Sequence, residues 1–138
     1  MRAGAAVVWT VNVKHVICAW LQKIASAERQ IPAIIAEELD KEITLKNKVD
    51  KVIMFGSVAR GEERPDSDID ILVITKNPAD KDKIKQGVIN ASARLLSVLG
   101  NPLVPVVYSR LEAKRKNNSR LMRAIHKDGI ILYDGELA

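Results

Sequence analysis

The sequence is short of the residues that build disulfide or zinc frameworks. Cys18 is the single cysteine among 138 residues, so the chain can form neither an internal disulfide nor a cysteine cluster that binds zinc. The two histidines, His15 and His126, stand far apart in the sequence and indicate no metal site. A reducing compartment fits this composition, and we expect a cytoplasmic protein.

Long apolar runs are also missing. The run from Ala3 to Val11 is interrupted by Asn12 and Lys14, well short of the roughly 20 residues that a membrane-spanning helix needs. We therefore expect no transmembrane helix, no secretory signal and no membrane partner.

An acidic excess is missing as well. The chain has 22 Lys and Arg against 17 Asp and Glu, a formal charge of +5, which favours polyanionic partners such as nucleotides or RNA.

What the chain does have is enough apolar sequence for one core, since 47% of its residues are hydrophobic. The first thirty residues are ambiguous, because a run of valines before residue 14 resembles a strand whereas later apolar residues recur at helical spacing. We favour a helix from about His15 to Glu28. The sequence thus predicts an N-terminal helical extension over residues 1–30 and one domain over residues 31–138.

Helical and strand patterns alternate through the rest of the chain. Pro32 suits the first turn of a helix that ends near Asn47. The apolar stripe of this helix is Ile35, Leu39 and Ile43. Short apolar runs predict strands over residues 52–55, 69–74, 103–108 and 130–133. This order predicts an α/β (α+β) fold, in which helices flank a mixed β-sheet of about four strands.

Local signals mark the ends of three further helices. Asp80 is the expected N-cap of a helix that Gly100 ends. The residues of this helix expected to face the core are Ile84, Val88, Ala91, Leu95 and Val98. Ser109 and Glu112 have the spacing of a capping box, and Ser119 is the expected cap of a short helix that runs to Lys127.

The residues between the first two predicted strands carry the candidate chemistry. Gly56 ends a strand where a side chain would block the approach of a phosphate, and Ser57 adds a hydroxyl donor beside free backbone amides. Asp68 and Asp70 are two residues apart at the start of the next strand, so their carboxylates should point to one face. Mg²⁺ binds such carboxylates together with substrate phosphates. Two metal ions would activate an attacking oxygen and stabilise the leaving one.

A structural interpretation stands beside the chemical one. Gly-Ser pairs are common in surface loops, and an acidic cluster entering a strand can be a solvated edge or an Asx turn at Asp66 and Ser67. Four fixed identities between two apolar strands favour the chemical interpretation.

The string Gly-Ser-Val-Ala-Arg-Gly at residues 56–61, followed by Asp-Ser-Asp-Ile-Asp at residues 66–70, resembles the minimal nucleotidyltransferase branch of the DNA polymerase β-like nucleotidyltransferase superfamily. The similarity extends over about residues 33–134. It implies magnesium as cofactor and transfer of a nucleoside monophosphate, most plausibly AMP from ATP, to a protein or small-molecule hydroxyl. It also implies a separate helical partner of the HEPN type, in a toxin–antitoxin pair.

The resemblance assigns roles residue by residue. Gly56 and Ser57 match the phosphate-binding pair, and Asp68 and Asp70 match the catalytic metal ligands. Arg60 lies beside the phosphates in the motif, so it could support them, but an exposed loop arginine explains it equally well.

The sequence departs from the family at one position. Members with transfer chemistry have a third carboxylate on a later strand, which helps bind metal and accepts a proton. The corresponding strand here, residues 103–108, contains no acid, and Pro105 occupies the expected position. Glu112 is the next acid, but the capping box explains it without catalysis.

Two alternatives to an active enzyme remain. A domain without the third carboxylate could be a catalytically weak or inactive nucleotide-binding or partner-binding protein. A basic segment after residue 113 could bind RNA or an acidic protein, but it contains no interleaved aromatic residues and is more typical of a solvated helix face. Its residues are Lys114, Arg115, Lys116, Arg120 and Arg123.

Overall fold

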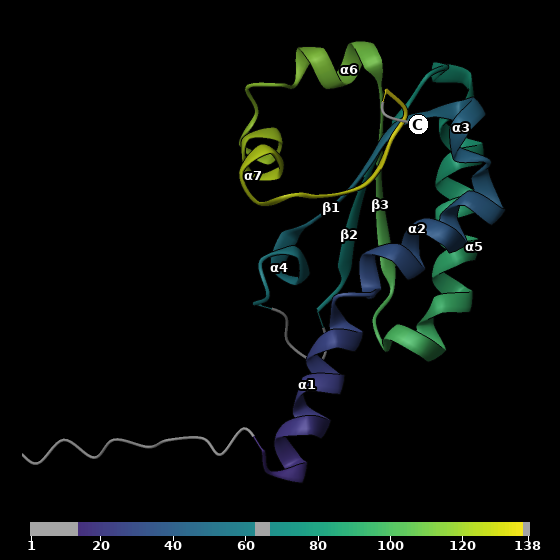
Figure 1. Cartoon of the computed structure of the whole chain (residues 1–138). Helices are drawn as coiled ribbons and strands as arrows, with labels where there is room; N and C mark the ends of the chain where they lie inside the picture. Colours follow the sequence, from purple (N-terminus) through teal and green to yellow (C-terminus); the bar gives the residue numbers. More distant parts are fainter. Residues whose placement is uncertain (1–13, 63–66, 137–138) are drawn as a thin grey trace, which may run out of the picture. The chain divides into compact units, whose positions relative to one another are not determined.

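A computed structural model describes residues 14–62 and 67–136 (Figure 1). The chain divides into two compact units, with the boundary between Gln30 and Ile31. The first unit contains α1 (Val16–Glu28), which confirms the predicted helix. The valine run before residue 14 lies outside the described residues. No helix in the described ranges is long and apolar enough to cross a membrane.

The second unit is built on a four-stranded sheet in the order β3-β2-β1-β4. Its strands are β1 (Val49–Phe55), β2 (Ile69–Thr75), β3 (Leu103–Ser109) and β4 (Ile130–Asp134). β1 pairs antiparallel with β2 and β4, whereas β2 pairs parallel with β3. The predicted mixed sheet is therefore confirmed. β1 begins three residues before the predicted strand, because Asp50 and Lys51 interrupt the apolar run without interrupting the backbone ladder.

One face of the sheet is covered by α2 (Ile31–Ile43) and α5 (Lys81–Leu99) (Figure 1). The predicted stripe of α2, Ile35, Leu39 and Ile43, is buried in this core. The two helices approach closely at Gly87, where an added Cβ would lie 2.9 Å from Cγ1 of Ile43.

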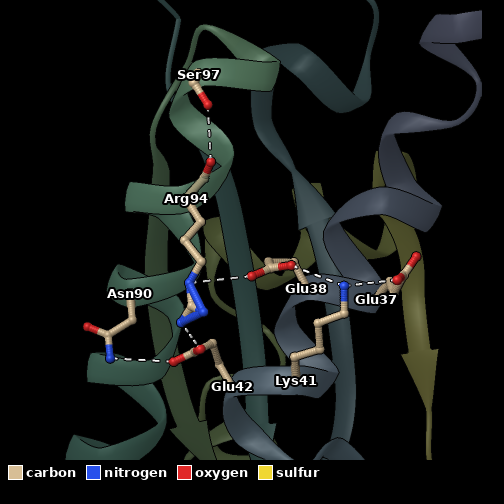
Figure 2. Close-up of polar contacts among 7 residues, drawn as sticks. All are labelled: Glu37, Glu38, Lys41, Glu42, Asn90, Arg94 and Ser97. Atoms are coloured by element: carbon tan, nitrogen blue, oxygen red, sulfur yellow. Dashed lines mark hydrogen bonds and ion pairs between the residues drawn. The ribbon is translucent and has the colours of Figure 1, made fainter.

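The outer surface of this helix pair carries a network of ion pairs (Figure 2). Arg94 of α5 pairs with Glu38 and Glu42 of α2, and Lys41 pairs with Glu37 at 2.9 Å and with Glu38. These cations are more than half exposed, so each pair contributes little by itself and the network mainly fixes how α2 meets α5.

The opposite face of the sheet is covered by two shorter helices, α6 (Arg110–Arg115) and α7 (Arg120–Asp128). A third short helix, α4 (Gly56–Ala59), follows the end of β1, and its Val58 and Ala59 pack against the core beneath α2 and α5. Met122 and Ile125 of α7 are buried against Ile53, Phe55 and Leu72 of the sheet. The capping box of Ser109 and Glu112 is confirmed, and the Ser119 hydroxyl accepts a hydrogen bond from the Met122 amide at 3.2 Å.

Two expected details are wrong, and a third is confirmed only in position. The helix at Pro32 ends at Ile43 rather than near Asn47, because Thr44 adopts a left-handed conformation (φ 58°) before the short α3 (Leu45–Lys48). Asp80 occupies the N-cap position of α5 without a side-chain bond, since a 3-10 turn that Asn77 caps precedes it. Val98 is 66% exposed, because the core-facing stripe steps from Leu95 to Leu99 in the last turn of α5.

Candidate functional site

Gly56 lies at the junction of β1 and α4. Its backbone has a left-handed φ of 83°, which residues with a side chain rarely adopt. A Cβ at this position would collide with Oδ2 of Asp70. The sequence suggested that glycine was needed for the approach of a phosphate. The structure adds a second reason, which is that the Asp70 carboxylate lies directly against the Gly56 backbone.

Ser57 lies in the first turn of α4, one residue beyond this contact, and is partly buried. Its carbonyl accepts a hydrogen bond from the Glu62 amide at 2.9 Å, which folds the following loop back onto α4. The first N–H groups of a helix have no acceptor within the helix. Ser57 therefore presents its hydroxyl among amide donors, a combination that suits anionic oxygens.

Asp68 and Asp70 flank the first residue of β2, Ile69. The start of this strand is held from the neighbouring turn, where the Ile69 amide donates to the Pro102 carbonyl at 2.9 Å and the Asn101 side chain donates to the Ser67 carbonyl. Asp68 is exposed and Asp70 is partly buried. The Asp70 carboxylate lies beside the start of α4, against Gly56, and Asp68 is close enough to act electrostatically on it.

The electrostatics of this pair favour a cation. Burial raises the pKa of the Asp70 carboxyl above its ordinary value, and the negative charge of Asp68 raises it further. A bound cation would remove both penalties on the ionised form. Two oxygen-donor side chains with an unfavourable mutual charge are thus suited to hold a hard divalent ion.

Arg60 is the C-cap residue of α4 and its side chain is exposed. Its Nε donates to Oε2 of Glu62 at 2.7 Å, and this partner raises the pKa of the guanidinium. Arg60 is therefore near Gly56 and Ser57 along the chain, but its charge is engaged with Glu62 rather than directed at the two aspartates.

Comparison with known proteins identifies the family. The chain matches the nucleotidyltransferase domain family over residues 34–129. It belongs to that family. The resemblance drawn from residues 56–70 is confirmed at this level.

Similar proteins and structures extend the comparison. Two proteins of Methanocaldococcus jannaschii, each named putative protein adenylyltransferase, resemble this chain. One is 37% identical over 79 residues, which cover 55% of this chain and 78% of the relative. The other is 33% identical over 88 residues, which cover 64% and 82%. A crystal structure of a toxin-antitoxin with AMP-PNP superposes with a TM-score of 0.53 at 22% identity, over 78% of this chain and 79% of that chain. It has the same fold.

The nucleotidyltransferase domain departs from the sequence-based expectation at the third carboxylate. Pro105 pairs with Ile71 in the parallel β2–β3 ladder, and Ile71 is fully buried in the core beneath α2 and α5. Paired residues of adjacent strands point to the same face, so Pro105 points away from Asp70. The assignment of Pro105 to the missing acid is therefore wrong. Val104, which pairs with Asp70, shares the face of the aspartates.

The absence of an acid on this strand remains a property of the nucleotidyltransferase domain. Within residues 14–62 and 67–136, no group of three His, Cys, Asp or Glu side chains could hold a metal ion. Glu63 and Asp66 of the connecting loop lie outside these ranges. Two carboxylates are what the described site provides.

Glu112 has a structural role. It accepts hydrogen bonds from Lys81 Nζ at 2.8 Å and from the Ser109 amide at 2.8 Å, and these partners lower its pKa to about 2. It caps the start of α6, as the capping-box interpretation predicts. Its hydrogen bond with Lys81 also links α6 to α5.

Sequence reasoning missed a cavity of about 750 Å³ on the face of the sheet that α6 and α7 cover. Its lining includes Ile53, Lys114, His126 and Ile131. Its lining comes from β1, β2, β4, α6 and α7, so no local pattern marks it. The basic residues that follow Ala113 were the available signal.

Proposed function

We propose that this domain is a metal-dependent nucleotidyltransferase that transfers AMP from ATP to a hydroxyl of a protein. The observation that carries the proposal is the junction of Gly56, Ser57 and Asp70, where a phosphate-binding turn touches a carboxylate of the metal-binding type. Family membership supports nucleotidyl transfer as the reaction. Adenylate and a protein acceptor are supported by the names of the two archaeal relatives.

Asp68 and Asp70 would hold the metal ion, and we infer Mg²⁺. The donors fit such an ion, because both are carboxylates, the Asp70 carboxylate lies against the Gly56 backbone, and Asp68 is close enough to act electrostatically on Asp70. Mg²⁺ usually takes one or two carboxylates and completes its shell with water and substrate phosphates. When bound, it would polarise the α-phosphate and neutralise charge on the departing pyrophosphate.

The other residues would bind the nucleotide. Ser57 and the amides of the first turn of α4 would hold the β- and γ-phosphates, and Gly56 leaves room for the Asp70 carboxylate beside them. Arg60 would add positive charge next to the phosphates after exchange of its Glu62 partner. In the transfer itself the acceptor oxygen forms a bond to the α-phosphorus while the bond to pyrophosphate breaks, with the two oxygens in line.

A second candidate function is nucleotide binding without efficient transfer. Val104 stands beside Asp70 in the ladder where a third carboxylate would have to lie. Without that acid the proton of the acceptor hydroxyl must pass to solvent, to Asp70 or to a group of the partner. General-base catalysis is commonly worth about 10² to 10⁴ in rate, so the isolated domain would react slowly.

The acceptor, we propose, is a helical partner protein of the HEPN type in a toxin–antitoxin pair. A toxin-antitoxin structure with AMP-PNP shares the fold. The described chain adds few elements beyond the sheet and its covering helices, so the acceptor would be recognised largely by surface contacts.

The test is transfer of label from α-³²P-ATP with Mg²⁺, with and without a candidate helical partner protein of the HEPN type from the same source. We expect label on the protein acceptor, and its loss in Asp68→Asn and Asp70→Asn. Asp82→Asn, an exposed acid on α5, is the matched control and should leave transfer unchanged.

The two candidate functions give different results. Calorimetric binding of ATP without transfer to any acceptor would favour the nucleotide-binding domain. Transfer that survives in both aspartate variants would contradict the site.

A further inference from the structure

The net charge of the chain is concentrated in one segment. Residues 110–128, which form α6, α7 and their connection, contain seven Lys and Arg but only two Asp and Glu. The segment therefore carries +5, which equals the formal charge of all 138 residues. Subtracting it from the totals of 22 and 17 leaves fifteen charges of each sign. We call residues 110–128 the basic surface.

The cavity of about 750 Å³ lies beneath the basic surface, and this volume is within the range of ligand pockets in proteins. Its floor is aliphatic and is made by Ile53, Ile74, Met122, Ile125 and Ile131. Ile131, on the edge strand β4, is 56% exposed. Ile53, Met122 and Ile125 are at most 8% exposed, so an apolar side chain from outside would mainly cover Ile131 and remove it from water.

The charges around the cavity are only partly balanced within the domain. Arg110 pairs with Asp50, and Lys51 pairs with Asp134. Lys114 and His126 also line the cavity and form no ion pair in the described part of the chain, while Glu136 is the remaining acid there. More cations lie along the exposed side of the same segment: Arg115, Lys116, Arg120, Arg123 and Lys127.

We propose that the basic surface and its cavity are a docking site for an acidic polypeptide segment that carries at least one bulky apolar side chain. The apolar side chain occupies the aliphatic floor, and neighbouring Asp or Glu side chains meet Lys114 and the outer cations. Buried apolar anchors within a polar rim are the usual source of affinity at protein interfaces, and the opposite charges speed association.

The chemistry of the floor favours a polypeptide over RNA. Nucleic acids without a fixed fold bind by stacking bases on aromatic rings along a basic groove. The lining of this cavity includes no Phe, Tyr or Trp, and its single ring is the imidazole of His126. The ring of Tyr108 is outside the lining and lies 5.0 Å from Lys116 Nζ in a cation–π contact. Aliphatic side chains instead match the side chains of Leu, Ile, Met or Phe.

The docking site is continuous with the proposed active site. α7 packs against α4, the helix that begins at Gly56, and Asp128 at the end of α7 acts electrostatically on Arg60. A segment bound on the basic surface would hold its protein beside the nucleotide. The inference rests on the proposed function for this consequence, but docking itself requires neither nucleotide nor metal.

The test is selection of a displayed library of random 12-residue peptides on the full-length protein, followed by fluorescence anisotropy with the selected peptides. We expect enrichment of Asp or Glu around one or two bulky apolar residues. Affinity should fall at least tenfold in Lys114→Glu and in Ile131→Glu. The matched controls, Lys85→Glu and Val98→Glu on α5, replace residues of the same kinds at exposed positions and should bind as the wild type does. Thermal melting would verify that all four variants fold.

Each other outcome decides against docking. The inference fails if no acidic peptide is enriched, if the controls weaken binding as much as Lys114→Glu does, or if a 12-nucleotide RNA binds more tightly and loses affinity in the same variants. The proposed function fails separately. Asp70→Asn should abolish Mg²⁺-dependent nucleotide binding and leave peptide affinity unchanged. The nucleotide measurement therefore tests the proposed function, and the peptide measurement tests docking independently.

Discussion

At the scale of single residues, Gly56 connects the two parts of the candidate site, which are the turn at the start of α4 and the Asp70 carboxylate. Gly56→Ala would add a Cβ that collides with the Asp70 carboxylate, and would place a side chain at φ 83°. We expect the carboxylate to move and Mg²⁺-dependent ATP binding to weaken at least tenfold. Gly61→Ala is the matched control, because Gly61 has φ 67° but no atom within 4 Å of the added Cβ.

Backbone strain should lower the stability of both glycine variants by about 1 kcal/mol. Only Gly56→Ala should lose nucleotide affinity in calorimetric titration. Equal affinity in the two variants would show that the contact between Gly56 and Asp70 does not matter for binding.

The ionised Asp70 carboxylate should lower the stability of the folded domain, although the proposed function needs it to bind the metal ion. Its pKa is raised by burial and by Asp68, so the ionised carboxylate costs stability at every pH above its folded pKa, and this cost disappears below its ordinary value of 3.8. We expect Asp70→Asn to melt at a higher temperature than the wild type at pH 7, with the gap closing as the pH falls toward 3.8. Mg²⁺ with ATP should raise the melting temperature of the wild type alone. A lower melting temperature of Asp70→Asn at pH 7 would contradict this account.

Val104 tests the register of β3. Val104→Asp would place a carboxylate on the face of Asp70, and we expect the rate of label transfer to rise at least tenfold, toward the lower end of what a general base supplies. Pro105→Asp is the control, since residue 105 pairs with the buried Ile71 on the opposite face. It should destabilise the domain without gain in rate. A gain from Pro105→Asp alone would show that the functional face of β3 is the opposite one.

At the scale of elements, helix α2 shows how far an apolar stripe predicts packing. Leu39 is fully buried between α2 and the sheet, whereas Val98 on α5 is 66% exposed. We expect Leu39→Ala to lower the free energy of unfolding by about 2–5 kcal/mol, and Val98→Ala by less than about 0.5 kcal/mol. Urea denaturation measures both. A comparable loss in the two variants would mean that α5 buries Val98 in solution.

The elements that could be predicted from sequence are those with local signals. The stripe of Ile35 and Leu39 predicts α2 because a helix repeats every 3.6 residues, and the capping box predicts the start of α6 from residues three apart. The face of the sheet to which Pro105 points depends on how β3 pairs with β2. About thirty residues of chain separate these two strands. Alternation of apolar and polar residues would indicate the register, but β2 and β3 are apolar at nearly every position, so their sequences do not show which residues pair.

The candidate site, too, could be predicted only where its residues are close together in the sequence. Gly56, Ser57, Asp68 and Asp70 fall within one short stretch, so their spacing alone indicated a shared edge of the sheet. The contact of Asp70 with Gly56, and the pairing of Arg60 with Glu62, required the folded chain. The cavity beneath α6 and α7 combines residues from both ends of the domain and was invisible to any local pattern.

At the scale of the whole molecule, the two proposed functional surfaces of the domain lie on one side of its sheet. The aspartates lie at the edge next to α4, and the basic surface lies over the remainder of that side. The other side is filled by α2 and α5, which pack through a buried apolar core and carry ion pairs among Glu38, Glu42 and Arg94 on their outer surface (Figure 2). This division leaves the side with the aspartates for substrate and partner.

The central claim is that Asp68 and Asp70 bind a metal–nucleotide complex against the turn at Gly56. The most direct measurement is calorimetric titration with AMP-PNP in Mg²⁺ and again in EDTA. The account predicts binding by the wild type in Mg²⁺, a loss of at least tenfold in EDTA and in Asp68→Asn and Asp70→Asn, and unchanged binding in Asp82→Asn. Equal affinity with and without Mg²⁺, or in all four proteins, would contradict it.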